Sequence, residues 1–307
     1  MKPSRRTPLP WHSVKPAADD PQAAARVAAI MASPSYLTGD TDAAFLQRDD
    51  MRATRLQLDY LKPELLLQAA GIRHAIVVFG GTRIQEPAAS ARRLEAASTA
   101  AAAAPADAEA GRRAQVAARL HASSRYYDVA REFGQLVGRS NRNATQGRTA
   151  VMTGGGPGIM EAANRGACDA GAPSIGLNIG LPHEQFPNPY VTPELCFCFH
   201  YFAMRKFHFL QRARALVAFP GGFGTLDELF EALTLLQTRK MDMVPVVLVG
   251  EEYWRRVIDI PFLVDEGVIE PEDAELFWFA EDAASIWNSI TEWYRNSGHD
   301  IFTPGAA

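Results

Sequence analysis

A glycine-rich turn that ends in a carboxylate is the segment of this sequence best suited to chemistry on a phosphorylated substrate. Residues 220–228 read Pro-Gly-Gly-Phe-Gly-Thr-Leu-Asp-Glu. A turn without Cβ atoms exposes amide N–H groups where it opens a helix, and the helix dipole adds positive charge there. A phosphate group is therefore the expected occupant of this turn.

Glu228, the last residue of the turn, has two interpretations. The dipole of the helix that starts here holds a carboxylate of the first turn ionised, and such a group beside a phosphate can stabilise a developing cation. Cleavage of a glycosidic bond produces a cation of this kind. Alternatively, Thr225 and Glu228 form a capping box, in which the two side chains satisfy amide groups at the helix end.

Two adjacent cations, Arg205 and Lys206, open the predicted helix that precedes this turn. Arg205 offers a planar fork that can bind a phosphate or orient a carboxylate, and Lys206 offers a point charge. The alternative is a solvated basic helix start, which is less favourable because cations are disfavoured near helix N-termini. We expect Arg205, 23 residues before Glu228, to reach the same edge of the sheet.

Two further glycine turns follow other predicted strands, at residues 80–82 and 154–156. Close packing of a strand on its next helix explains a single Gly-Gly equally well, but three such turns favour a ligand. None of them fits the G-x-G-x-x-G or G-x-x-x-x-G-K-[ST] pattern. The sequence therefore favours a mononucleotide or sugar phosphate over a dinucleotide or a triphosphate.

The elements that carry these turns alternate between strand and helix. This alternation predicts an α/β protein with a doubly wound, Rossmann-like parallel sheet and helices on both faces. Ligands of such sheets bind beyond the carboxyl ends of the strands, where the glycine turns fall. The predicted strands are 75–79, 149–153, 174–178, 195–199, 215–219, 244–249 and 277–279, and the main predicted helices are 112–137, 159–170, 202–214, 225–238, 253–264 and 282–294.

The chain is predicted to comprise an N-terminal arm and helical extension over residues 1–70, a nucleotide-binding catalytic domain over 71–297 and a tail over 298–307. Within the extension we expect one helix over 24–31 and a second from about residue 40, which Pro63 interrupts. The alanine-rich residues 96–110 contain Pro105 and are predicted to be an insertion or flexible connector.

Composition narrows the possible partners. The chain has 47% hydrophobic and 21% charged residues, a net charge of −4 and a pI near 6.0, so it has no global field that would attract nucleic acid or an anionic membrane. Three cysteines support neither a disulfide framework nor a zinc ribbon. We expect a cytoplasmic protein that does not span a membrane and needs neither a metal nor a cofactor.

The glycines at 154–156, the pair Arg205-Lys206 and the P-G-G-x-G-T-x-x-E form at 220–228 resemble the LONELY GUY family, whose members are often mislabelled as lysine decarboxylases. The similarity covers about residues 72–296. The longer bacterial type is more similar than the short plant-like members, which carry a histidine where this chain has Ala203 and lack the helices of residues 20–70. The resemblance implies a Rossmann-like fold and hydrolysis of the N-glycosidic bond of nucleoside 5′-monophosphates, including cytokinin ribotides, to free base and ribose 5-phosphate.

The resemblance also implies roles for individual residues and a homodimer or larger even assembly. Arg205 and Glu228 would be the catalytic pair. From the residues themselves, we expect Glu228 to stabilise an oxocarbenium ion and interpret Lys206, which follows Arg205 at a helix start, as an electrostatic group. No general acid is singled out among His183, Glu184 and His200. The residues implied to hold the 5′-phosphate are Gly221, Gly222, Gly224 and Thr225, and those implied to line the rest of the pocket are Gly80, Gly81, Thr82, Gly154, Gly155 and Gly156.

Two other functions are weighed against this one. A pyridoxal-dependent decarboxylase needs a lysine in a desolvated pocket, and of the five lysines only Lys206 lies at the predicted site. The remaining alternative is a carrier or sensor that binds a nucleotide or a molybdenum-cofactor-type ligand without catalysis. Glu228 distinguishes the carrier from the hydrolase, because a carrier has no need of an ionised carboxylate near the ribose.

Overall fold

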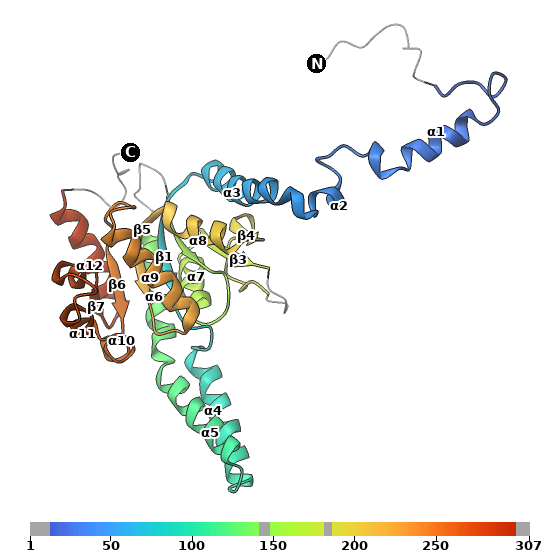
Figure 1. Cartoon of the computed structure of the whole chain (residues 1–307). Coiled ribbons are helices and arrows are strands. Elements are labelled where there is room, and N and C mark those ends of the chain that lie inside the picture. The colour runs from blue at the N-terminus through green and yellow to red at the C-terminus, as the bar shows by residue number, and fades with distance from the viewer. Residues whose placement is uncertain (1–12, 141–147, 181–185, 299–307) are drawn as a thin grey trace. The chain divides into compact units, whose positions relative to one another are not determined.

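The computed structural model describes residues 13–140, 148–180 and 186–298 of the chain (Figure 1). It has two compact units, Met1–Leu58 and Asp59–Ala307, and the boundary falls within helix α3 (Arg52–Ala69). The first unit contains α1 (Ala23–Met31), which confirms the helix predicted over 24–31, and the short helix α2 (Ala43–Leu46).

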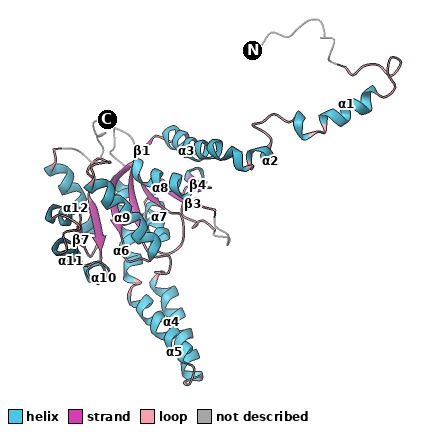
Figure 2. Cartoon of the chain, in the orientation of Figure 1, coloured by secondary structure: helices cyan, strands magenta, loops and turns pink. Residues whose placement is uncertain are grey.

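The second unit is built on one seven-stranded sheet in which all strands run parallel (Figure 2). The order across the sheet is β4-β3-β2-β1-β5-β6-β7, so the chain runs from β1 to one edge and then returns to β5, beside β1. The predicted α/β, Rossmann-like doubly wound sheet is thereby confirmed. The strands are β1 (Ile72–Phe79), β2 (Arg148–Thr153), β3 (Ser174–Ile179), β4 (Cys196–Phe199), β5 (Ala213–Ala218), β6 (Val246–Val249) and β7 (Trp278–Ala280).

Helices cover both faces of this sheet, which is why β1 is apolar along almost its whole length. Successive side chains of a strand point to opposite faces. Accordingly Ile76 and Val78 belong to one core and Val77 and Phe79 to the other. The first core is covered by α6 (Arg125–Ser140), α7 (Ile159–Asp169) and α12 (Ala283–Asn296), and the second by the end of α3 with α8 (Phe202–Gln211), α9 (Phe223–Gln237) and α10 (Glu251–Val257).

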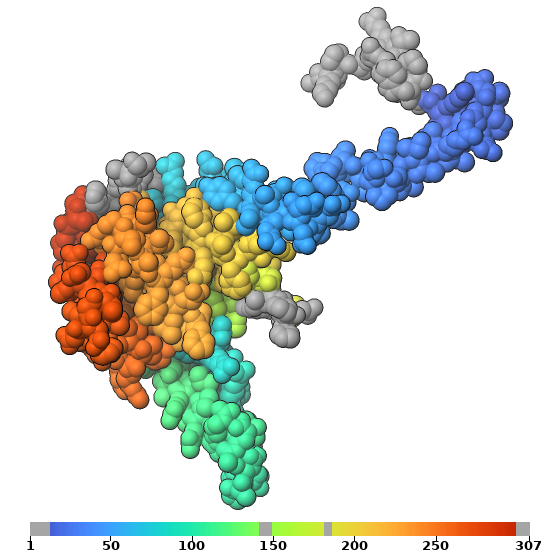
Figure 3. Space-filling model, viewed as in Figure 1, coloured from blue at the N-terminus to red at the C-terminus, as the bar shows by residue number. Residues whose placement is uncertain are grey.

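The alanine-rich segment is a helical hairpin rather than a flexible connector. Residues 96–103 lie in α4 (Pro87–Ala103), and after a short turn α5 (Ala108–Ala122) packs back along α4. Alanine has the highest helix propensity, and Asp107 caps α5 by accepting from the N–H groups of Glu109 and Ala110. Most of the hairpin surface is exposed to solvent (teal and green in Figure 3). The single helix predicted over 112–137 is also wrong, because the chain turns between α5 and α6.

Two predicted helix interruptions differ from the structure. Pro63 lies inside a continuous α3, where its fixed φ suits a helix and its burial beside Leu67 compensates for the missing backbone donor. Conversely, the helix predicted over 253–264 is divided into α10 and α11 (Ile260–Asp265), because Asp259 caps a new helix that has Pro261 in its first turn.

In the part of the chain that the structure describes, none of the helices has the length and apolar character that a membrane-spanning segment needs.

Candidate active site

The turns after β1, β2 and β5 meet at the carboxyl ends of these strands, where the order of strands across the sheet reverses. The N–H of Gly81 donates to the carbonyl of Pro220 (2.9 Å), and the N–H of Ile159 donates to the carbonyl of Gly81 (3.2 Å). Doubly wound sheets bind ligands in such a crevice. The crevice holds a cavity of about 340 Å³, lined by Phe79, Gly80, Gly81, Thr82, Gly154, Met160, Ile179, Phe202, Arg205, Phe209, Gly222, Gly224, Thr225, Asp227 and Glu228.

The first turn of α9 presents free backbone donors to this cavity. The helix begins at Phe223 with Gly222 as its N-cap, and the N–H groups of Thr225 and Leu226 both donate to the carbonyl of Gly222. In the described part of the chain nothing accepts from the N–H groups of Phe223 and Gly224. A Cβ at Gly222 or Gly224 would meet no protein atom within 4 Å, so both glycines border open space. These donors form a site suited to an anion.

The alternative interpretation of Thr225 and Glu228 as a capping box is wrong. The helix starts two residues earlier than predicted, so Thr225 lies inside the first turn and Glu228 in the second. Thr225 instead packs against Gly221, whose lack of a Cβ leaves room for the threonine side chain. Neither side chain is therefore needed to close the helix end.

Glu228 presents a buried carboxyl group to the cavity. Its exposed fraction is 8%, and burial raises its pKa to about 7, while the cations Lys206 and Arg205 oppose the rise. The expectation that the dipole alone keeps Glu228 ionised is therefore too simple, because the carboxylate form predominates only above about pH 7. Within the described residues no group hydrogen-bonds to this carboxyl and no cation lies within ion-pair distance. It is thus available to a ligand.

Arg205 projects from the first turn of α8 into the same cavity. Its Nε donates to the carbonyl of Leu177 in β3 (2.7 Å), and its guanidinium lies 5.2 Å from the ring centre of Phe209. Burial lowers the Arg205 pKa and the nearby Glu228 opposes this, but a guanidinium stays charged in proteins. A Cβ at Gly154 would collide with Nη2 of Arg205. The turn after β2 therefore leaves space for the arginine head group.

Four of the residues predicted to bind substrate do not line the cavity. Lys206 bridges α8 to α9 by pairing with Asp227 and Glu231, each at 2.9 Å. The others shape the turns: Gly221 accepts from the Tyr253 hydroxyl, Gly155 adopts φ +71° beside Asn178, and Gly156 accepts from Asn188.

A buried amide network holds the turn after β2. Thr153 donates to Asn164 (2.7 Å) and accepts from the N–H of Gly155 (2.9 Å), while Asn188 donates to Asn164 and to the carbonyl of Gly156 (3.0 Å each). The exposed fraction of Asn164 is 0%. Because every partner is an internal polar group, the turn has one preferred conformation before any ligand arrives.

Three residues that line the cavity could not be recognised as site residues from the sequence. Met160, Ile179 and Phe202 form an apolar wall of the cavity, but each resembles an ordinary residue of its helix or strand. Of the three candidate acids, His183 and Glu184 lie outside the described residues. His200 does not line the cavity.

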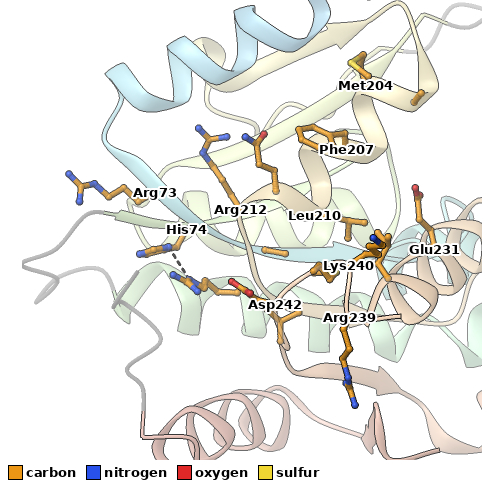
Figure 4. A pocket seen from close by; sticks show the side chains of 17 residues that line it. Arg73, His74, Met204, Phe207, Leu210, Arg212, Glu231, Arg239, Lys240 and Asp242 are labelled. Carbon is orange, nitrogen blue, oxygen red and sulfur yellow. Dashed lines mark hydrogen bonds between the residues drawn. The ribbon is translucent and has the colours of Figure 1, made fainter. Parts of the chain in front are cut away.

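A second cavity of about 980 Å³ lies at the opposite, amino ends of β1 and β5 (Figure 4). It is lined by several cations, among them Arg212, Arg214 and Lys240, but by none of the predicted site residues. These cations follow the C-terminal ends of α8 and α9, where positive charge compensates the helix dipole. Arg212 also pairs with Glu64 of α3. The positions of the cations therefore have a structural cause.

The raised pKa of Glu228 makes stability depend on pH. Between about pH 4.5, the usual pKa of a glutamate, and about pH 7 the native state binds more protons than the unfolded state, so the free energy of unfolding falls as pH rises. Glu228→Gln removes this titration. We expect the variant to be more stable than wild type by roughly 2 to 3 kcal/mol at about pH 8 and equally stable near pH 4.5. Urea denaturation at both pH values measures this, and an equal difference at both would contradict it.

Three comparisons with known proteins relate to this site. Residues 160–290 match the family described as "Possible lysine decarboxylase". The cytokinin riboside 5′-monophosphate phosphoribohydrolase LOG3 of Arabidopsis thaliana is 28% identical over 173 residues, which cover 55% of this chain and 76% of that protein. The probable phosphoribohydrolase LOG4 of Oryza sativa subsp. japonica is 26% identical over 145 residues, which cover 46% of this chain and 62% of that protein.

Solved structures with a similar arrangement include two molybdenum-cofactor proteins. The Moco carrier protein of Chlamydomonas reinhardtii has 19% identity and a TM-score of 0.43, with coverage of 73% of this chain and 99% of that one. The molybdenum cofactor binding protein of Rippkaea orientalis has 21% identity and a TM-score of 0.38, with coverage of 55% and 87%. Similarity at this level is too low to indicate a ligand. The family match and the curated relatives together show that this chain is similar to the LOG family.

Proposed function

We propose that this chain hydrolyses the N-glycosidic bond of nucleoside 5′-monophosphates, giving a free base and ribose 5-phosphate. The observation that carries the proposal is that the Glu228 carboxyl, which has no hydrogen-bond or ion-pair partner among the described residues, shares one glycine-lined cavity with the Arg205 guanidinium. The LOG relatives act, by their names, on cytokinin riboside 5′-monophosphates, which supports the same class of reaction here.

The 5′-phosphate binds at the start of α9. The free N–H groups of Phe223 and Gly224 and the dipole of α9 favour a dianion there, and Gly222 and Gly224 leave the space that it needs. The Thr225 side chain borders the same space. Because Lys206 is engaged by two carboxylates, it acts by holding α8 and α9 together rather than by direct contact with phosphate.

Glu228 then faces the ribose, about one helical turn from the phosphate site. As the bond from C1′ to the base nitrogen breaks, its electron pair leaves with the base and C1′ gains oxocarbenium character, which the ionised carboxylate stabilises. Water adds its oxygen to C1′, Glu228 is positioned to accept the proton that the water releases, and the departing base nitrogen takes up a proton from solvent to give the free base. Activity should therefore rise with pH through the pKa of Glu228, about 7.

Arg205 contributes positive charge and a fixed direction. Its bond to the Leu177 carbonyl leaves the other guanidinium nitrogens for substrate oxygens, so it orients the sugar phosphate relative to Glu228. The base of the nucleotide then contacts the apolar wall formed by Met160, Ile179 and Phe202. Phe202 is 52% exposed and offers a ring face for stacking.

The test is incubation of purified protein with AMP, GMP, CMP, UMP, IMP and isopentenyladenosine 5′-monophosphate, with free base and ribose 5-phosphate measured by chromatography. We expect release from at least one nucleotide and release about a hundredfold slower from the matching nucleoside, which lacks the phosphate. Nucleotide binding without release would instead support the carrier alternative. Equal release from nucleoside and nucleotide would contradict the assigned phosphate site.

A further inference from the structure

The end of α3 contacts α8, the helix that carries Arg205, through side chains at both ends of that helix. Oδ2 of Asp59 accepts from the N–H groups of His200 and Tyr201, each at 2.9 Å. At the other end Arg212 pairs with Glu64 through two hydrogen bonds of 2.6 and 2.5 Å. We call the residues Asp59, Tyr60 and Glu64 the α3 clamp.

Between these two contacts, Tyr60 of the α3 clamp packs against His208, a buried histidine of α8. Nε2 of His208 donates to the carbonyl of Tyr60 (3.1 Å), and the two rings stack with centres 5.6 Å apart. The exposed fraction of His208 is 0%, and burial lowers its pKa. Burial therefore favours the neutral form of His208, and this part of the clamp is a packing contact.

Asp59 anchors the backbone that leads into α8. The N-cap residue Tyr201 forms no side-chain cap, but its own N–H and that of His200 before it both donate to the carboxylate of Asp59. A negative charge here is also favoured by the helix dipole. The carbonyl of Tyr201 in turn accepts from the N–H of Arg205 (3.3 Å). Asp59 is thus two hydrogen bonds away from the backbone of Arg205.

We propose that Asp59 is a positioning residue for Arg205, which it serves by fixing the first turn of α8. This inference rests on the proposed function, because it gives the position of Arg205 a catalytic purpose. Among the residues that the structure describes, the side chain of Arg205 is held only by the Leu177 carbonyl and by ring contacts. If the first helical turn unwinds, the guanidinium loses its direction towards the cavity while the rest of α8 stays in place.

The kinetic test compares Asp59→Ala with Glu64→Gln, a matched control that removes the contact at the far end of the same helix. We expect Asp59→Ala to lower kcat about tenfold, with a smaller change in KM, and Glu64→Gln to leave kcat within about twofold at a comparable loss of Tm. Asp59→Asn keeps one acceptor oxygen and should retain most of the activity. Equal loss of kcat in Asp59→Ala and Glu64→Gln would overturn the proposal, because the α3 clamp would then stabilise α8 as a whole and have no specific effect on Arg205.

A double-variant test asks whether Asp59 acts through Arg205. In an Arg205→Ala background, Asp59→Ala should lower turnover no further, because the group that it positions is gone. An additional tenfold loss would assign Asp59 a different role.

A spectroscopic readout separates this inference from the proposed function. Nε–H of Arg205 is protected by its bond to the Leu177 carbonyl, and its NMR signal is identified as the one lost in Arg205→Lys. Hydrogen exchange at this group should become at least tenfold faster in Asp59→Ala and remain unchanged in Glu64→Gln. A wild type without turnover would refute the proposed function, whereas unchanged exchange in Asp59→Ala would refute the positioning role alone.

Discussion

Turnover of nucleoside monophosphates is expected to fall by about a thousandfold in Glu228→Gln, with the fold intact. The amide keeps the size of the side chain but cannot carry the negative charge that stabilises the oxocarbenium ion, and one such electrostatic contact supplies about 3 to 4 kcal/mol. The loss should appear in kcat, because the phosphate site at the start of α9 is unchanged and ground-state binding persists. Initial rates of ribose 5-phosphate release measure both constants.

Glu231→Gln is the matched control for this experiment. Glu231 lies one turn further along α9 and pairs with Lys206 (2.9 Å), but it does not line the cavity of Glu228. We expect its turnover to stay within a few fold of wild type. A Glu228→Gln enzyme with normal kcat, or an equal loss in both variants, would show that the carboxylate of Glu228 has no direct part in the reaction.

Gly154→Ala is expected to lower kcat/KM about a hundredfold without removing any functional group. The added methyl group would collide with Nη2 of Arg205 and lie 2.9 Å from Sδ of Met160, so the guanidinium must move. The backbone at Gly154 does not require positive φ, and alanine is therefore conformationally acceptable there. A displacement of about 1 Å at a positioned group commonly costs this much in rate. Steady-state kinetics with the preferred nucleotide give the value.

Two further variants show whether the effect passes through Arg205. Gly111→Ala in α5 places a methyl group where no atom lies within 4 Å, and we expect wild-type kinetics from it. In an Arg205→Ala background, Gly154→Ala should add little to the loss already present. Full additivity of the two losses would mean that the methyl group blocks substrate directly instead of displacing the arginine.

The sequence predicts those parts of the site that directly follow the strands of the sheet. Parallel strands present their carboxyl ends at one edge of a sheet, so strands that end at residues 79, 153 and 218 place the three glycine turns at the same edge. Their order across the sheet, which makes these turns neighbours, comes from the structure. The same argument brought Arg205 and Glu228 towards one cavity. It could not find Phe202 or Met160, because an apolar residue near a helix start has no pattern that separates a cavity wall from a core.

Side-chain pairing was the part that sequence could not supply. Lys206 is occupied by Asp227 and Glu231 through helix packing that no local spacing specifies. The raised pKa of Glu228 depends on the burial of its carboxyl group, which the amino-acid sequence alone does not show. The prediction that Pro63 interrupts the helix is wrong for a related reason. Helix propensity takes account of the missing backbone donor but not of the packing of α3 that compensates for it.

The order of strands in the sheet also has a consequence for biosynthesis. β1 and β5 are neighbours, yet β2, β3 and β4 are made between them, so the backbone bond from Gly81 to Pro220 joins segments that leave the ribosome far apart in time. Closing such a long loop has an entropic cost that later contacts must offset. Nascent chains that end before α9 can contain the turns at Gly80 and Gly154 but no anion site, so ligand capture can begin only when most of the protein has been synthesised.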